Sequence, residues 1–470
     1  GASGGAIYAN QIIGNMSGSN FKVNSAGGGG ALYVNILSGD SSGTLFSRST
    51  FDANTATSGN GGAVRAGSFA GSIINNTQFT NNTASDGGGA IWVNDTMSGT
   101  LSDTLFQYNS ATNGFGGAIF TGGRATVVAT NASFLNNSAT QGGAWYSAGV
   151  DSNIQLTNSY LYNNTASLNG GAMAFGSGQV LSIDGTSLQG NTAGQNGGAL
   201  YFDTDNANGL PYTVTFSGTP DNPTPFIYNT ANGVNNSFSV GGVASQANFT
   251  LNIAGNGNVN LYDPFSVDMA GGTGRSFTMS ANSSAATLLM SGENNISVNN
   301  GTARVSLLQG ITQVRSDMVN GTDFTMRFRD NTNSSVRLGS GNILTILALG
   351  DRQYDKPVFD FRVVTGGTKR FTAEAGTTID ITRVLSPLPN HRYLLVAGMD
   401  AGTAPDVNNF VYLHPDDYHQ VPLIENGGTE LWLDLSKVPD AFDHNVATPN
   451  TIATRNCLDY WLNWSTASMG

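Results

Sequence analysis

The chain has 470 residues, of which 11% are charged and 39% are hydrophobic, and its 19 basic and 31 acidic residues give a net charge of −12. This acidic balance argues against nucleic acid or an anionic membrane surface as the main partner, because both require basic patches. The only cysteine, Cys457, excludes an internal disulfide framework. Many glycines, asparagines and β-branched residues predict an all-β protein rich in turns.

A repeat of about 27 residues runs through the first half of the chain. Its first motif is a Phe or Leu followed, three positions later, by Asn, then Ser or Thr, then Ala. The eight asparagines of this motif are Asn24, Asn54, Asn82, Asn109, Asn137, Asn164, Asn191 and Asn229. We expect each Asn to lie at a turn and to pass an amide hydrogen bond to the Asn of the next copy, forming a structural ladder.

The second motif is Gly-Gly-Ala followed by an apolar residue, as in 61–64, 88–91 and 116–119. Apolar or small residues alternate after it, which predicts a strand with one face toward a core. A third strand fits between the motifs, for example at 153–157 and 180–183. The glycines predict a turn that needs positive φ or close backbone stacking.

Three short strands and three turns in about 27 residues predict one coil of a right-handed parallel β-helix, a β-solenoid. Stacking neighbouring coils would place equivalent residues one above another, about 4.8 Å apart. The Phe and Leu residues of the first motif would then form a buried column, and the fold needs a C-terminal β cap to cover its last coil.

One column of the Gly-Gly-Ala strands should face solvent, and it is mostly aromatic. It consists of Tyr8, Tyr33, Arg65, Trp92, Phe120, Tyr146 and Tyr201, with Ala174 between the last two. One interpretation is a self-stacking set of rings that stabilises the sheet. The other is a contact strip for a glycan or a host protein, because contiguous exposed apolar surface often marks a binding site.

The regularity of the repeats and the local composition divide the chain into four segments. Residues 1–243 hold the regular repeats, with a loop expected near 205–240, and residues 244–385 should form seven or eight irregular rungs. Residues 386–440 read as the C-terminal cap. Residues 441–470 form a linker that includes a helix beginning near the Thr448-Pro449 pair. The chain opens inside a repeat, so we expect it to be a segment of a longer protein.

The paired motifs of residues 1–243 resemble the repeats of the chlamydial polymorphic outer-membrane protein family of autotransporter passengers. Residues 390–435 look like an autochaperone cap, and the segment at 448–461 is similar to the stretch before a translocator barrel. The resemblance implies type V secretion, a membrane connection only through a barrel outside this fragment, and display on the bacterial surface or release from it. It also implies adhesion to host receptors or glycans and a role in virulence. Self-association is an extension of this interpretation, because a long flat flank of a solenoid can pair with copies on other cells.

The alternative function is that of a β-helix polysaccharide lyase or glycoside hydrolase. Such an enzyme needs carboxylates on neighbouring rungs, but the acidic residues of the repeats fall in different columns. Asp203 and Asp205 lie in a loop that does not fit an EF-hand. We therefore predict no catalytic residue, no metal site and no cofactor.

Overall fold

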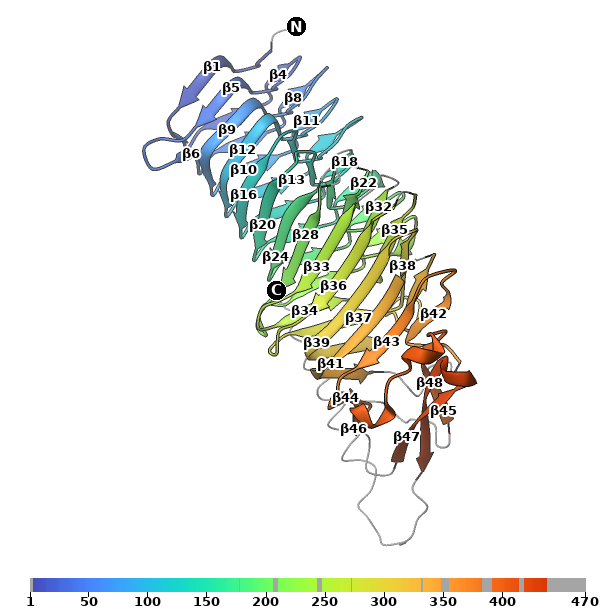
Figure 1. The fold of residues 1–470 in the computed structure, drawn as a ribbon. Helices are drawn as coiled ribbons and strands as arrows, with labels where there is room; N and C mark the ends of the chain where they lie inside the picture. Colours follow the sequence, from blue (N-terminus) through green and yellow to red (C-terminus); the bar gives the residue numbers. More distant parts are fainter. Residues whose placement is uncertain are drawn as a thin grey trace.

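The computed structural model describes residues 3–176, 178–205, 210–242, 247–271, 273–330, 333–347, 355–382, 391–413 and 418–437. The helix predicted after residue 448 and Cys457 lie outside these residues. The described strands stack in parallel along an elongated rod, which confirms the predicted β-solenoid (Figure 1). The right-handed sense stays a prediction. Within the described part of the chain, no helix has the length and apolar character needed to span a membrane.

Three faces of the rod are parallel sheets. The Gly-Gly-Ala sheet contains β1 (Ile7–Ile13), β5 (Leu32–Ser38), the first halves of β9 (Val64–Asn75) and β12 (Ile91–Ser102), β15 (Ile119–Thr121), β19 (Trp145–Ser147), β23 (Met173–Phe175), β27 (Leu200–Asp203), β32 (Phe238–Gly242), β35 (Ser266–Met269), β38 (Glu293–Val298), β40 (Thr325–Arg329), β42 (Phe359–Val363) and β45 (His391–Ala397).

The long sheet begins with β2 (Met16–Ser17), β6 (Thr44–Ser47) and the second halves of β9 and β12. It continues through β16 (Ala125–Thr130), β20 (Ser152–Thr157), β24 (Gln179–Asp184), β28 (Tyr212–Ser217), β33 (Asn248–Ile253), β36 (Ser276–Ala281), β39 (Thr302–Arg315), β41 (Asn333–Ile346) and β43 (Lys369–Ala373).

The Phe sheet carries the first motif. Its strands are β3 (Asn20–Lys22), β7 (Thr50–Asp52), β10 (Gln78–Thr80), β13 (Leu105–Gln107), β17 (Ser133–Leu135), β21 (Tyr160–Tyr162), β25 (Ser187–Gln189), β29 (Thr224–Ile227), β34 (Asn258–Leu261), β37 (Thr287–Ser291), the second halves of β39 and β41, β44 (Thr377–Asp380) and β46 (Phe410–Leu413).

Each regular coil also has a fourth, shorter strand that the sequence did not reveal. These strands pair in a separate sheet formed by β4 (Ser25–Ala26), β8 (Thr55–Ala56), β11 (Thr83–Ala84), β14 (Ser110–Ala111), β18 (Ser138–Gln141), β22 (Thr165–Asn169), β26 (Thr192–Ala193), β30 (Thr230–Ala231) and the antiparallel β31 (Val234–Asn235). They contain the Ser or Thr and the Ala of the first motif.

The two glycines of the second motif have different roles. In the coil that follows β11, Gly88 has a φ of +58°, a conformation that glycine adopts without strain. A Cβ on Gly89 would lie 2.0 Å from the carbonyl oxygen of Gly117 in the next coil. The first glycine therefore makes the turn, and the second permits the close stacking of the backbone.

The predicted Phe column is buried and stacked. Phe51, Phe79 and Phe106 are fully buried, and the rings of Phe51 and Phe79 lie 4.7 Å apart with nearly parallel planes. The ring of Phe106 follows at 5.0 Å. Burial of each such side chain contributes about 1.5–3 kcal/mol, so this column stabilises every coil that it crosses.

The asparagine ladder forms as predicted. Seven consecutive hydrogen bonds of 2.8–3.0 Å join the Nδ2 of each Asn, from Asn24 to Asn191, to the Oδ1 of the next, ending at Asn229. The Oδ1 of Asn137 also accepts from the backbone N–H of Asn109, and its Nδ2 donates to the carbonyl oxygen of Phe106. The buried amides thus have partners on both sides, which defines the register of the coils.

A carboxylate that the sequence did not single out ends this ladder. Asp263 is buried and accepts from Tyr228 N–H at 2.9 Å, Asn229 N–H at 2.8 Å and Asn229 Nδ2 at 2.9 Å. These three donors favour the charged form, but burial is the larger effect and, with nearby Asp317, raises the pKa of Asp263 to about 7.

Two expectations for the irregular part are wrong. The segment near 205–240 is not one loop, because Tyr212–Ser217 forms β28, which pairs in register with β24 and β33. After residue 244, the long sheet has five successive strands among the described residues, not seven or eight: β33, β36, β39, β41 and β43. β39 and β41 are 14 residues long, and each contributes to two faces of the rod. Each of these rungs therefore takes up more residues, and fewer rungs fit into the segment.

The predicted C-terminal β cap is antiparallel. β48 (Glu430–Lys437) pairs antiparallel with β45 on one side and with β47 (Tyr418–Glu425) on the other. The 3-10 helices η1 (Ala401–Thr403), η2 (Val407–Asn409) and η3 (Asn426–Gly428) lie between these strands in the chain. This small sheet occupies the end of the rod opposite β1 (Figure 1).

Candidate functional site

The candidate site is the outward column of the Gly-Gly-Ala sheet, in which the structure brings together the seven predicted residues. Register pairs Tyr8 with Tyr33, Tyr33 with Arg65 and Arg65 with Trp92. It then pairs Trp92 with Phe120, and Phe120 with Tyr146. Ala174 separates Tyr146 from Tyr201, as the sequence spacing predicted.

The side chains of this column stack on one another. The rings of Tyr8 and Tyr33 lie 5.3 Å apart, and the guanidinium of Arg65 lies 4.7 Å above the Tyr33 ring, a cation–π contact. Trp92 and Phe120 stack at 3.7 Å with an angle of 6° between their planes. The Phe120 and Tyr146 rings follow at 5.8 Å. The predicted aromatic stacking is therefore present.

The expected exposure of the column is wrong for two of its members. Tyr8 is 68% exposed, whereas Phe120 and Tyr201 are only 7% and 9% exposed. Tyr33, Arg65, Trp92 and Tyr146 are half-buried. Accessible aromatic surface therefore lies mainly at the N-terminal end of the column, with a smaller part at Tyr33, Trp92 and Tyr146.

In the middle of the column, residues that precede the Gly-Gly-Ala motif cover part of it. The ring of Phe115 packs 4.8 Å from the ring of Tyr146. The backbone of Gly87 lies against Trp92, since a Cβ there would be 2.6 Å from Cζ3 of the indole. A period-2 pattern separates the two faces of a strand, but it does not reveal that a preceding turn lies across the outer face.

The same column continues through the irregular rungs with different chemistry. Tyr201 is followed in register by Ser239, Ser266 and Asn295, and then by Arg327 and Asp360. The outward surface of the sheet thus changes along the rod from aromatic to hydroxyl and amide groups, and finally to charged groups.

Tyrosines and carboxylates lie together where the column changes from aromatic to hydroxyl and amide side chains. Burial raises the pKa of the Asp203 carboxyl, although this carboxyl accepts a hydrogen bond from the backbone N–H of Asp205 that acts in the opposite direction. Burial and the charge of Asp203 also raise the pKa of both Tyr146 and Tyr201, which places that carboxylate near both phenols. Asp268 is exposed two rungs from Asp203 in the same column. Phenol rings beside carboxylates provide both stacking and hydrogen-bond acceptors for a polar ligand.

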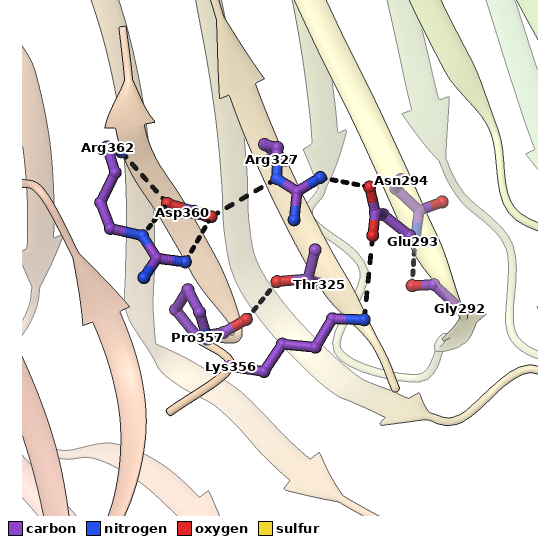
Figure 2. Close-up of polar contacts among 9 residues, drawn as sticks. All are labelled: Gly292, Glu293, Asn294, Thr325, Arg327, Lys356, Pro357, Asp360 and Arg362. Carbon is purple, nitrogen blue, oxygen red and sulfur yellow. Dashed lines mark hydrogen bonds and ion pairs between the residues drawn. The ribbon is translucent and has the colours of Figure 1, made fainter. Parts of the chain in front are cut away.

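Arg327 and Asp360, at the charged end of the column, belong to a chain of alternating charges (Figure 2). Arg327 lies between Glu293, which accepts from its Nη1, and Asp360, whose Oδ2 is 3.4 Å from its Nε. Arg362 binds both oxygens of Asp360 at 2.9 Å, and the Nζ of Lys356 lies 3.8 Å from Glu293. The contacts to Arg362 and Arg327 outweigh burial and lower the pKa of Asp360. We interpret this cluster as a set of ion pairs that links successive coils, as the asparagine ladder does through amide hydrogen bonds.

Sequence reasoning missed another exposed aromatic group, on the Phe sheet. Tyr108, Tyr160 and Tyr162 are 56%, 57% and 41% exposed. Tyr160 and Tyr162 flank the buried Leu161 of β21, so their outward direction follows from strand alternation. The positions on either side of the Phe column would have identified Tyr160 and Tyr162, whereas Tyr108 lies in the turn that follows β13.

Among the described residues, no group of three or more His, Cys, Asp or Glu side chains is placed to hold a metal ion. Comparisons with models of known protein families, with curated proteins and with solved structures give no match to this chain.

Proposed function

We propose that this chain is a surface-displayed autotransporter passenger that acts as an adhesin for host receptors or glycans. In this proposal the rod is exported by type V secretion and presents the outward column of the Gly-Gly-Ala sheet to its partner. The observation that carries the proposal is the continuous register of this column, from the exposed Tyr8 through the half-buried Tyr33, Trp92 and Tyr146 to the polar residues after Tyr201.

Rigid stacked rings suit such a contact. Tyr and Trp give large contact areas with little loss of side-chain entropy on binding, and they are enriched at protein interfaces. Here the stacking of Trp92 on Phe120 already holds the side chains in one arrangement. A partner would therefore meet a surface that is organised before binding.

The test is binding of the purified chain to host cells and to a glycan array. Changing Tyr8 and Tyr33 to Ser removes the exposed ring of Tyr8 and the half-buried ring on which it packs, both outside the core. A second variant changes Trp92 and Tyr146 to Ser. Both should bind about tenfold more weakly or worse, the effect of losing more than about 1.4 kcal/mol of contact.

The matched control changes Tyr160 and Tyr162 to Ser, which removes two exposed rings from the Phe sheet. This control should bind as the parent does. The adhesive role of the column is wrong if all three variants bind equally well while circular dichroism shows them folded. Sedimentation of the parent over a range of concentrations tests self-association of the rods.

A carbohydrate-active enzyme is the second candidate. The observation in its favour is the raised pKa of Asp203 beside Tyr146 and Tyr201, because acid–base catalysts have carboxyls shifted in this direction. Release of reducing or unsaturated ends from a polysaccharide panel, lost on changing Asp203 to Asn, would support this candidate. An Asp221 to Asn variant, altered in the turn between β28 and β29, is its control.

A further inference from the structure

The outer face of the long sheet is almost free of charge until its last rungs. From β16 to β36 its outward positions carry Ser, Thr, Asn, Gln or Val, and Asp184 is the one carboxylate within these strands. The next three strands, β39, β41 and β43, also contain no Asp or Glu. Their outward positions instead carry Arg304, Arg337 and Arg370.

These three arginines form one basic patch. Arg304 pairs in register with Ser335, and Ser335 pairs with Arg370, so Arg304 and Arg370 belong to one column, two rungs or about 10 Å apart. Arg337 occupies the adjacent column on the middle rung. All three side chains are exposed. Arg304 and Arg337 lie between buried neighbours, and Arg370 lies between the partly buried Lys369 and the buried Phe371.

Little negative charge neutralises this patch. Arg337 pairs with Glu374, but these side chains are 56% and 39% exposed, and ion pairs so open to solvent are weak. Within the described residues, no ion pair or hydrogen bond involves the guanidinium of Arg304 or Arg370. The patch is therefore a local excess of positive charge on a chain whose net charge is −12.

Hydroxyl groups surround the arginines. Thr278 and Ser306 precede Arg304 and Arg337 in their columns, and Ser335 and Thr372 lie between or beside them on the same face. Such side chains can donate to and accept from sugar hydroxyls. The surface thus combines planar cations with neutral hydrogen-bonding groups along the direction in which the coils stack.

We propose that the face of β39, β41 and β43 binds a linear sulfated polysaccharide, with sulfate groups on Arg304, Arg337 and Arg370. A guanidinium presents paired N–H donors that match two oxygens of an oxyanion. A polymer with anions on successive sugars can reach all three rungs, whereas a small anion reaches one. This site lies on a different face from the aromatic column and does not depend on it.

The test is retention of the whole chain on immobilised heparin and its dissociation constant for a defined heparin oligosaccharide at physiological salt. Changing Arg304, Arg337 and Arg370 together to Gln should weaken binding at least about tenfold and lower the salt needed for elution. The reason is that a protein with fewer cations displaces fewer counterions from the polysaccharide when it binds. Changing Glu374 to Gln frees Arg337 and should strengthen binding, a gain that misfolding cannot produce.

The matched control changes three other exposed arginines, Arg48, Arg124 and Arg329, to Gln and so has the same net charge as the first variant. It should keep most heparin binding, as should the variant with Trp92 and Tyr146 changed to Ser, which separates this site from the adhesive column. The proposal is overturned if the parent does not bind heparin, if both triple variants lose binding equally, or if unsulfated hyaluronate or duplex DNA binds as tightly as heparin.

Discussion

Asn229 donates from its Nδ2 to the Oδ2 of Asp263 at 2.9 Å, and this bond joins the last asparagine of the ladder to a buried carboxylate. An eighth Asn-to-Asn link is therefore replaced by an acidic group that accepts three hydrogen bonds from the preceding coil. The regular and irregular parts of the solenoid meet at a residue that can titrate.

Stability should depend on the protonation of Asp263. Its folded pKa of about 7 lies above the ordinary value of 3.8, so the folded state binds the proton more tightly than the unfolded state. The resulting stabilisation is complete below about pH 3.8 and is lost as the pH rises through 7, at up to about 1.4 kcal/mol per pH unit. Urea unfolding between pH 5 and 8 measures this slope, and changing Asp263 to Asn should remove it.

Removing one ladder residue should cost more in the middle than at the end. Changing Asn137 to Leu removes the acceptor of the Asn109 Nδ2 and the donor to the Asn164 Oδ1 and the Phe106 carbonyl, and each lost partner costs about 1–3 kcal/mol. We expect a loss of more than about 3 kcal/mol. The same change at Asn24, which is only partly buried and begins the ladder, should cost less than half as much. Equal unfolding midpoints in urea would contradict this.

The second glycine of the Gly-Gly-Ala motif should not tolerate a side chain. A Cβ on Gly89 would meet the backbone oxygen of Gly117 at 2.0 Å, so the stacked coils would have to separate. We expect Gly89→Ala to lower stability by about 3 kcal/mol or more. Gly366→Ala, where a Cβ would meet nothing within 4 Å, is the control and should unfold at the parent temperature or slightly above it.

Arg327 should stabilise the C-terminal coils by separating two carboxylates. Replacing it with Met leaves Glu293 and the nearly buried Asp360 without the cation between them, and we expect a cost of about 2 kcal/mol. Arg329→Met, on the same strand and exposed, should change stability by less than about 0.5 kcal/mol. Similar losses from both variants, measured by urea unfolding, would show that the cluster in Figure 2 adds nothing beyond surface charge.

The repeat in the sequence was sufficient to predict the regular coils. Asn109, Asn137 and Asn164 stand one above another, and Phe79 stacks on Phe106, because residues one period apart become neighbours when parallel strands pair. The glycine pairs, the buried columns and the order of the aromatic column follow from the same periodicity. Only local spacing was needed for these predictions.

The tertiary structure alone determined the contacts between different columns and between coils of unequal length, because a constant repeat spacing does not specify them. Phe120 is buried between the stacked rings of Trp92 and Tyr146, and these two rings are themselves covered by Gly87 and Phe115 from preceding turns, which is a contact between different columns. Arg327 pairs with Asp360 across 33 residues in coils of unequal length, so no constant spacing connects them. Asp263 and the patch of Arg304, Arg337 and Arg370 likewise depend on the register of irregular coils. That register is determined by the packing of each coil on the previous one.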